Sequence, residues 1–172
     1  QGQNGYFWWA FDIKQKAVSK IKNSGIAYSI FYASTFMESF DKGAYRQGNT
    51  INLSGESKHK MYLISGTDYG KQVLIAFTLD NGNQEYVIQG PDGFTADEAA
   101  RIFVTNYKKR NIKVMKFPFW ILKFMGNLTN TFNYGAHIID ALNNYPEKFA
   151  AEKSWQDLGQ PKIKFVDYIR NA

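Results

Sequence analysis

The opening third of the chain carries apolar residues with two different spacings. Between residues 11 and 23 they recur every three or four positions, among lysines: Ile13, Ala17, Val18 and Ile21. This spacing predicts an amphipathic helix with one stripe facing a core. Ser24-Gly25 supplies a helix stop, and residues 26–32 form a short run rich in Ile, Tyr and Phe, typical of a buried strand. A helix, a glycine and a buried strand in this order predict an α/β fold.

The middle of the chain alternates between loop, helix and strand signals. Residues 39–60 are rich in Gly, Ser, Asn and Lys and are predicted to be mostly loop, with a short strand at 50–53. A second helix is expected to begin with Thr67 or Asp68 as its N-cap, and a second strand is expected at 84–89.

Helical signals dominate the last part of the chain. Thr95 and Glu98 have the spacing of a capping box, in which each side chain accepts a hydrogen bond from the other residue's backbone N–H. The helix that they begin is predicted to run to about Lys109. Further short helices are expected at 136–142 and 146–157.

Composition excludes several kinds of site. The 172 residues contain no cysteine, so disulfides, cysteine–zinc sites, iron–sulfur clusters and thiol nucleophiles are excluded. His59 and His137 are the two histidines and lie far apart in the sequence, so no metal site is predicted. The net charge of +6 suits an anionic partner, which could be a nucleotide, a nucleic acid or an acidic lipid surface. Because no leader and no apolar run of spanning length is recognised, we expect a soluble cytoplasmic protein.

Six short motifs follow one another between the first helix and the capping box. They are Lys14, Ser24-Gly25, Ser29-Ile30-Phe31-Tyr32-Ala33, Phe36-Met37-Glu38-Ser39, Asp68-Tyr69-Gly70, and Gly90-Pro91 followed by Thr95, Glu98 and Ala100. In order and spacing they resemble the C-terminal half of an atypical short-chain dehydrogenase/reductase, of the NmrA-like and nucleoside-diphosphate-sugar-epimerase-like type. The resemblance covers about half of the chain.

The resemblance implies an α/β fold that combines the C-terminal part of a Rossmann-type parallel sheet with a mostly helical substrate lobe. Residues 1–94 would form the end of the Rossmann-type domain and residues 95–172 the lobe. The Gly-x-x-Gly-x-x-Gly turn that holds a dinucleotide in this family does not occur in the sequence. We therefore expect the dinucleotide-binding half to lie upstream of Gln1. NAD or NADP should bind the full-length protein, and should bind this chain weakly or not at all.

The resemblance also assigns roles on the first helix. The wider superfamily uses Tyr-x-x-x-Lys, which puts a proton-donating tyrosine and a ribose-binding lysine on one helix face. Lys14 matches the lysine and is our candidate catalytic and cofactor-binding residue, but Ala10 stands where the tyrosine would be. The isolated chain is therefore expected to be inactive, and whether the full-length protein is an enzyme stays open. The alternative for Lys14 is a solvated helix lysine, like Lys20.

The loop after the first strand resembles the family's nicotinamide and substrate loop. The resemblance implies cofactor contacts for Ala33, Ser34, Thr35 and Phe36, and substrate contacts for Phe36, Met37 and Phe40. The alternative for Phe36 and Met37 is a place in the hydrophobic core. Glu38 and Asp41 could serve as pocket carboxylates or be solvated loop acids. Asp68 is interpreted as an N-cap rather than as a catalytic acid.

A basic stretch at 107–116 precedes an apolar run at 117–125. The cations and the neighbouring aromatic residues have the composition of a nucleic-acid surface, but cations at a helix C-terminus are favoured without any ligand. The apolar run is too short to cross a bilayer, and we expect it to form a buried wall of the substrate lobe rather than a membrane anchor. No membrane partner is predicted, and nucleic acid is disfavoured.

These observations support one functional hypothesis with alternatives. The full-length protein is predicted to be an NAD(P)-binding oxidoreductase- or epimerase-like protein that acts on a small or sugar-nucleotide-like molecule, with the catalytic tyrosine lost. The alternatives are a non-catalytic module that senses NAD(P) or binds a partner, and a nucleic-acid-binding domain. Because a truncated Rossmann sheet has a free strand edge, we also expect either a homodimer joined near residues 6–11 and 26–32 or binding of the missing half.

Overall fold

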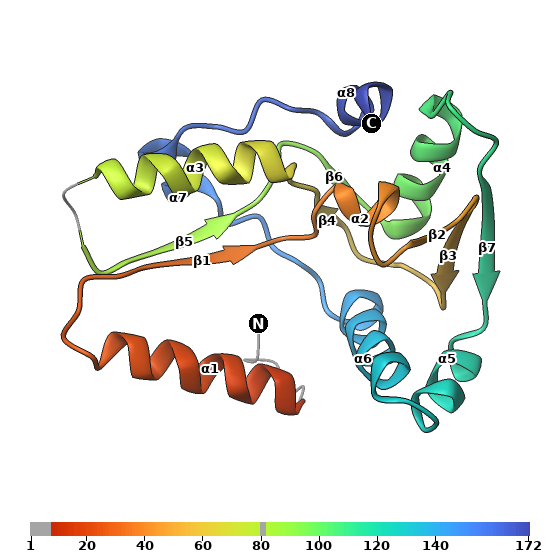
Figure 1. The fold of residues 1–172 in the computed structure, drawn as a ribbon, viewed down its shortest axis with the longest axis horizontal. Helices are drawn as coiled ribbons and strands as arrows, with labels where there is room; N and C mark the ends of the chain where they lie inside the picture. The colour runs from red at the N-terminus through yellow and green to blue at the C-terminus, as the bar shows by residue number, and fades with distance from the viewer. Residues whose placement is uncertain (1–7, 80–81) are drawn as a thin grey trace.

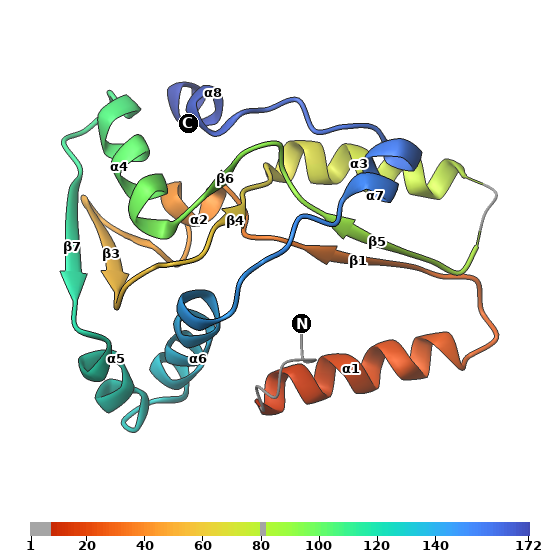
Figure 2. The ribbon, with the colours of Figure 1, turned by 180° about the vertical axis from the view of Figure 1, so that it is seen from behind.

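The fold has a parallel-strand part at one end and a larger lobe at the other (Figure 1, Figure 2). The computed structural model describes residues 8–79 and 82–172. The parallel-strand part consists of α1 (Trp9–Lys22), β1 (Ser29–Ala33), α3 (Gly66–Thr78), β5 (Gln84–Ile88) and α7 (Glu152–Leu158). β1 and β5 pair in parallel, from Ser29 opposite Gln84 to Ala33 opposite Ile88. The predicted α/β fold with parallel strands is therefore confirmed.

A small core joins β5 to two helices of this part, α3 and α7. Its fully buried members are Ile64, Ala76, Tyr86, Ile88 and Leu158. α3 begins at Gly66 because the Ser65 side chain accepts a hydrogen bond from the Asp68 backbone N–H, at 3.1 Å. The N-cap is thus Ser65, and the prediction of Thr67 or Asp68 was wrong by two or three positions.

β1 is more exposed than its apolar sequence predicts. The predicted buried strand at 26–32 is observed at Ser29–Ala33, and no residue of the strand is fully buried. β1 pairs with β5 on one edge, and no strand of the described residues pairs with its other edge. A strand of a parallel sheet is usually covered on both faces and paired on both edges unless it lies at the side of the sheet. β1 therefore presents a free edge.

α1, predicted over residues 11–23, is observed at Trp9–Lys22, but it does not have the predicted packing. The stripe expected to face a core is exposed, with Ile13 at 56% and Ile21 at 44%. Ala10 is the buried residue of this helix. The residue before the helix anchors it, because the buried Trp8 ring stacks on His137 with centroids 5.3 Å apart and lies 4.8 Å from the Tyr134 ring. α1 is thus held at its first turn, by the lobe.

The lobe contains more strand than predicted. Its elements are α2 (Glu38–Asp41), β2 (Arg46–Gln47), β3 (Thr50–Ser54), β4 (Met61–Tyr62), β6 (Gly93–Phe94), α4 (Ala96–Asn106), β7 (Lys113–Phe117), α5 (Phe119–Gly126), α6 (Asn130–Asn144) and α8 (Phe165–Asn171). One sheet has the order β2-β3-β7, with β3 and β7 parallel, and β4 pairs with β6 antiparallel. Residues 95–172 are mostly helical, as predicted, and β7 is the one strand that lies wholly within them in the described chain. The strands that the prediction did not include lie earlier, where segments within 39–60 pair with β7 from much later in the chain.

The core of the lobe draws on residues from both sides of position 94. Met37, Leu63, Phe103 and Phe165 all belong to one buried cluster. α7, which follows the lobe helices in sequence, packs instead with β5. A single division after residue 94 therefore does not separate the two cores. The chain passes from the parallel-strand part into the lobe and back more than once (Figure 1).

The signal for the start of α4 is confirmed, whereas the predicted ends of several helices differ from the observed ones. The capping box is confirmed, since Thr95 Oγ1 accepts from the Glu98 N–H and Glu98 Oε2 accepts from the Thr95 N–H. α4 ends at Asn106, before the predicted Lys109. α6 contains the predicted 136–142, but residues before Glu152 in the predicted 146–157 helix are not helical. In the described part of the chain, no helix combines the length and apolar content needed to cross a membrane.

Candidate functional site at the carboxyl ends of the parallel strands

The candidate site lies at the carboxyl ends of β1 and β5, because open α/β sheets bind ligands at the carboxyl ends of their strands. The loop that leaves β1 is pinned to its surroundings by backbone hydrogen bonds. The Ser34 N–H donates to the Ile88 carbonyl at 2.9 Å, and the Ile64 N–H donates to the Thr35 carbonyl at 3.1 Å. The Met37 N–H donates in turn to the Ile64 carbonyl at 2.9 Å. The predicted cofactor loop is thus a fixed wall at the end of the sheet.

A carboxylate that the sequence analysis did not single out lies at the centre of this edge. Glu147 Oε2 accepts from the Ser34 hydroxyl at 2.8 Å and from the Tyr62 N–H at 3.3 Å, and its Oε1 accepts from the Gln89 amide at 2.6 Å. Burial raises the pKa of Glu147 above its ordinary value, and these hydrogen bonds oppose the shift. A partly desolvated acid that contacts both strand ends is a candidate functional residue.

Gln89 holds the segment that carries Glu147 in place. Its side chain is almost fully buried, donates to the Lys148 carbonyl at 2.9 Å, and accepts from the Ala150 N–H at 2.8 Å. The Trp155 indole N–H donates to the Gln89 carbonyl at 3.1 Å. The segment between α6 and α7 is therefore tied across the end of β5. No local pattern near residue 147 signals this arrangement, because its partners come from distant parts of the chain.

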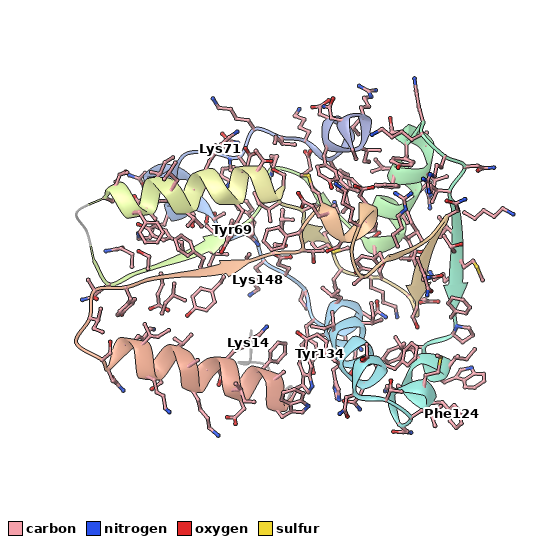
Figure 3. The ribbon with its side chains drawn as sticks, in the orientation of Figure 1. Lys14, Tyr69, Lys71, Phe124, Tyr134 and Lys148 are labelled. Carbon is pink, nitrogen blue, oxygen red and sulfur yellow. The ribbon has the colours of Figure 1, made fainter. Side chains whose placement is uncertain are left out.

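Two lysines face each other beside this edge. In Figure 3 the side chains of Lys14, from α1, and Lys148, from the segment between α6 and α7, extend toward one another. Both residues are exposed, and neither forms an ion pair with another residue of the described part of the chain. By contrast, Lys16 on the same helix pairs with Asp12 at 2.7 Å. Two uncompensated cations that converge next to the strand ends favour an anionic ligand.

Tyr32 is a nearby phenol, but it is not suited to replace the missing tyrosine. Its hydroxyl donates to Glu85 at 2.7 Å, and Glu85 also pairs with Lys22 at 2.6 Å. Partial burial is the largest cause, and the hydrogen bond to Glu85 the second largest, of the rise in the pKa of Tyr32 to about 12. A proton donor that works near neutral pH needs a pKa close to that pH. Ala10, four residues before Lys14, is buried and carries no proton to transfer.

The predicted substrate residues divide into one at the surface and two in the core. Phe36 is partly buried and packs edge-on against Tyr69, with centroids 5.3 Å apart. Met37 and Phe40 are completely buried in the core of the lobe, where the Phe40 ring stacks on Tyr45 at 4.5 Å. Because fully buried side chains offer no surface to a ligand, the predicted substrate contacts of Met37 and Phe40 are replaced here by core packing.

The acidic side chains suggested as pocket residues are engaged in holding the backbone. Glu38 Oε1 accepts from the Gly66 N–H at 3.0 Å, at the start of α3. Asp41 pairs with Arg46 at 2.8 Å, and both side chains are nearly buried. Asp68 is buried, and its Oδ2 accepts from the Lys162 and Ile163 N–H groups at 2.8 and 2.7 Å. These three acids stabilise the fold and are not arranged as a catalytic group.

No metal centre is seen in the described part of the chain. No three side chains among its histidines, aspartates and glutamates gather as a metal would require. The site is therefore an edge with one partly buried carboxylate, two facing cations and a loop wall that carries Phe36.

Comparison with known proteins shows which solved structures have a similar fold. The sequence matches no protein-family model and no curated protein. Among solved structures, the chain is similar to leucoanthocyanidin reductase of Vitis vinifera in complex with NADPH, with a TM-score of 0.67 and 12% identity. The alignment covers 94% of this chain and 59% of the reductase. The chain has a Rossmann-like reductase/epimerase fold.

Two epimerase structures give the same result. A nucleoside-diphosphate-sugar epimerase of Staphylococcus aureus aligns with a TM-score of 0.64 and 14% identity, over 91% of this chain and 56% of the epimerase. UDP-glucose 4-epimerase of Thermotoga maritima, bound to UDP-glucose, aligns with a TM-score of 0.53 and 11% identity, over 93% and 49%. The chain thus spans about half the length of these proteins.

Proposed function

We propose that this chain is the C-terminal part of an NAD(P)-binding protein of the reductase/epimerase type. It contributes the end of the parallel sheet and the lobe that receives a small or sugar-nucleotide-like substrate. Two observations support this proposal. Nearly the full length of this chain aligns with its structural neighbours, but the alignment covers only about half of each neighbour's length. In addition, β1 has one free edge. Residues upstream of Gln1 would supply the strands that pair with that edge and the glycine-rich turn.

Lys14 is the proposed cofactor contact, and its position facing Lys148 is the observation that carries the proposal. A lysine that is exposed and has no acidic partner keeps its ammonium available for a ribose hydroxyl or a phosphate oxygen. Lys148, which the sequence analysis missed, would reinforce the attraction for the anionic cofactor. When bound, NAD(P) supplies the hydride chemistry. The backbone of Ala33, Ser34, Thr35 and Phe36 would form the wall against which the cofactor lies.

The proposed protein departs from the superfamily's acid–base chemistry. Position 10 is a buried alanine, and the nearby phenol of Tyr32 has a pKa near 12. Glu147 contacts Ser34 and Gln89 at the two strand ends, but all its hydrogen bonds are with groups of the fold. These features favour a protein that binds NAD(P) as a sensor, or that reduces its substrate without a tyrosine donor. A full-length protein that binds NADH or NADPH but oxidises neither would support the sensor.

The decisive experiment measures binding of NADH and NADPH to the full-length protein by calorimetry. Lys14→Ala should weaken the tighter of the two by about tenfold, because a charge-assisted hydrogen bond contributes roughly 1–2 kcal/mol. Lys20→Ala is the matched control, since it removes an exposed lysine from the same helix about 120° away from Lys14. Unchanged affinity in the Lys14 variant would reject Lys14 as a cofactor contact. Absence of binding to the wild-type protein would reject the function.

A further inference from the structure

Charge is strongly segregated in the second half of the sequence. Between Glu98 and Asp140 there is no acidic residue, but there are cations at Arg101, Lys108, Lys109, Arg110, Lys113, Lys116 and Lys123. Lys116 is neutralised by Asp97, at 2.8 Å. The other cations of β7 and α5, Lys113 and Lys123, form no ion pair with the described residues. This part of the lobe therefore carries net positive charge.

The outer face of β7 is apolar as well as cationic. Side chains alternate along a strand, and Lys116 points toward α4, where it meets Asp97. Lys113, Met115 and Phe117 therefore lie on the opposite face, away from α4. All residues of β7 are exposed, because β7 is the edge of its sheet and no element of the described chain covers this face. Met115 and Phe117, which are 46% and 37% exposed, thus place apolar side chains beside Lys113 on the outer face of the strand.

α5 extends the same apolar surface. One side of the helix packs closely on α6, where Gly126 lies so near that a Cβ would meet the Asn133 Cα at 3.2 Å. The other side presents Trp120, Phe124 and, just beyond the helix, Leu128, which are 68%, 62% and 68% exposed. Their four-residue spacing places them in one stripe. A helix that is apolar on all sides normally has all sides covered, in a core or by lipid.

This surface lies far from the edge that an upstream half would occupy. α5 and β7 lie at the end of the molecule opposite the parallel-strand part, and the turn between α5 and α6 forms the lower side of the lobe in both views (Figure 1, Figure 2). The labelled Phe124 side chain extends outward from this end (Figure 3). Completion of the sheet at β1 would therefore leave the surface of Met115, Phe117, Trp120, Phe124 and Leu128 uncovered. We call these five residues the tip surface.

We infer that the tip surface docks on the headgroup region of an anionic lipid bilayer. Trp and Phe rings that project from a convex end, with lysines beside them and no acid among them, have the chemistry of an interfacial membrane contact. Lys123 illustrates the arrangement, since its ammonium lies 4.8 Å from the centre of the Phe119 ring and keeps its charge at the rim. The Tyr107 ring of the neighbouring basic stretch is half-buried and contacts both Phe103 and Arg46, which leaves it less surface for stacking on nucleic-acid bases.

The test is co-sedimentation of the full-length protein with vesicles of phosphatidylcholine, alone or mixed with phosphatidylserine. Binding is expected to the anionic vesicles and to weaken with salt. The double variant Trp120→Ser and Phe124→Ser should bind on the order of a hundredfold more weakly, because each buried aromatic ring contributes roughly a tenfold gain in partitioning. The matched control is Leu74→Ser with Phe77→Ser on α3, which removes side chains that are 67% and 82% exposed outside the tip surface.

A second measurement keeps the inference testable if the double variant folds poorly. Trp120→Phe retains an apolar ring, so vesicle binding should persist while quenching of tryptophan fluorescence by brominated lipid falls. Undiminished quenching in this variant would place the bilayer at another tryptophan and overturn the inference. Absence of sedimentation with anionic vesicles would also overturn it. So would light scattering that shows a dimer which only the tip-surface double variant dissociates, since a second copy would then be the occupant.

Discussion

Glu147 shows how a single residue can hold the end of a sheet together. Its carboxylate accepts hydrogen bonds from residues that follow β1, precede α3 and follow β5. Three donors stabilise the ionised form, whereas burial stabilises the neutral form, and burial prevails in raising its pKa. Protonation of Glu147 should therefore change the stability of this end of the sheet as the pH changes.

Glu147→Gln tests this link through the pH dependence of stability. A carboxyl whose folded pKa is raised stays protonated in the folded protein when the unfolded chain has already ionised. The free energy of unfolding of the wild type should therefore fall as pH rises from the ordinary glutamate pKa of 4.5 to the raised value, relative to that of the variant. Urea unfolding of both proteins at a series of pH values measures the difference. Parallel curves would contradict the assignment.

At the scale of elements, the Gly-Pro segment after β5 is explained by a close approach between strand ends. The Gly90 N–H donates to the Tyr62 carbonyl at 3.2 Å, and a Cβ at Gly90 would lie 1.7 Å from the Leu63 carbonyl oxygen. No side chain fits there unless the backbone moves. The motif that the resemblance to reductases picked out thus has a packing reason, which is to let β5 pass against the β4 segment.

Substituting two glycines separates this close approach from general glycine flexibility. Gly90→Ala should destabilise the protein by about 3 kcal/mol or more, because a backbone carbonyl must shift. Gly70→Ala, in α3, meets nothing within 4 Å and should stabilise by about 0.5–1 kcal/mol through helix propensity. Chemical denaturation of the two variants measures both effects. If the Gly90→Ala and Gly70→Ala variants were equally stable, the segments at Gly90 and Leu63 would be able to move apart without loss of stability.

At the scale of the whole molecule, the free edge of β1 and the exposed stripe of α1 have one explanation. The edge presents unpaired backbone N–H and C=O groups and the stripe presents apolar side chains, and the rest of the described chain covers neither. A missing half of the sheet would cover them, and a second copy of the chain is the alternative. The predicted dimer seam included residues 6–11 and 26–32, of which residues 6 and 7 lie outside the described residues.

Self-association of the isolated chain tests the proposed seam. We expect dimers at micromolar concentration, and Ile26→Lys, at a position 73% exposed beside β1, should raise the dimer dissociation constant about tenfold by placing a charge in the seam. Phe77→Lys is the control, since that residue is 82% exposed on α3. Light scattering over a dilution series is the measurement. A stable wild-type monomer would favour a self-sufficient binding module over a partial enzyme.

The sequence by itself determined the features that depend on near neighbours in the chain. The spacing of Ile13, Val18 and Ile21 predicted α1, and Thr95 with Glu98 predicted the start of α4, because helix hydrogen bonds and caps join residues only three or four positions apart. The α/β fold with parallel strands was also predicted correctly, because its motifs occur in a recognisable order. Lys14 was singled out from the same order, and its cofactor role stays a proposal.

Only the tertiary structure decided which surfaces meet and which remain open. Glu147 contacts Ser34 across 113 positions, and β7 pairs with β3 from the first half of the chain, yet no local pattern encodes either partner. The run 117–125 was expected to be buried, and this was wrong: Trp120 and Phe124 are exposed because α5 packs on one side only, against α6. The hydropathy of a residue indicates whether its side chain prefers an apolar environment. Its burial depends instead on how many helices and strands pack against it.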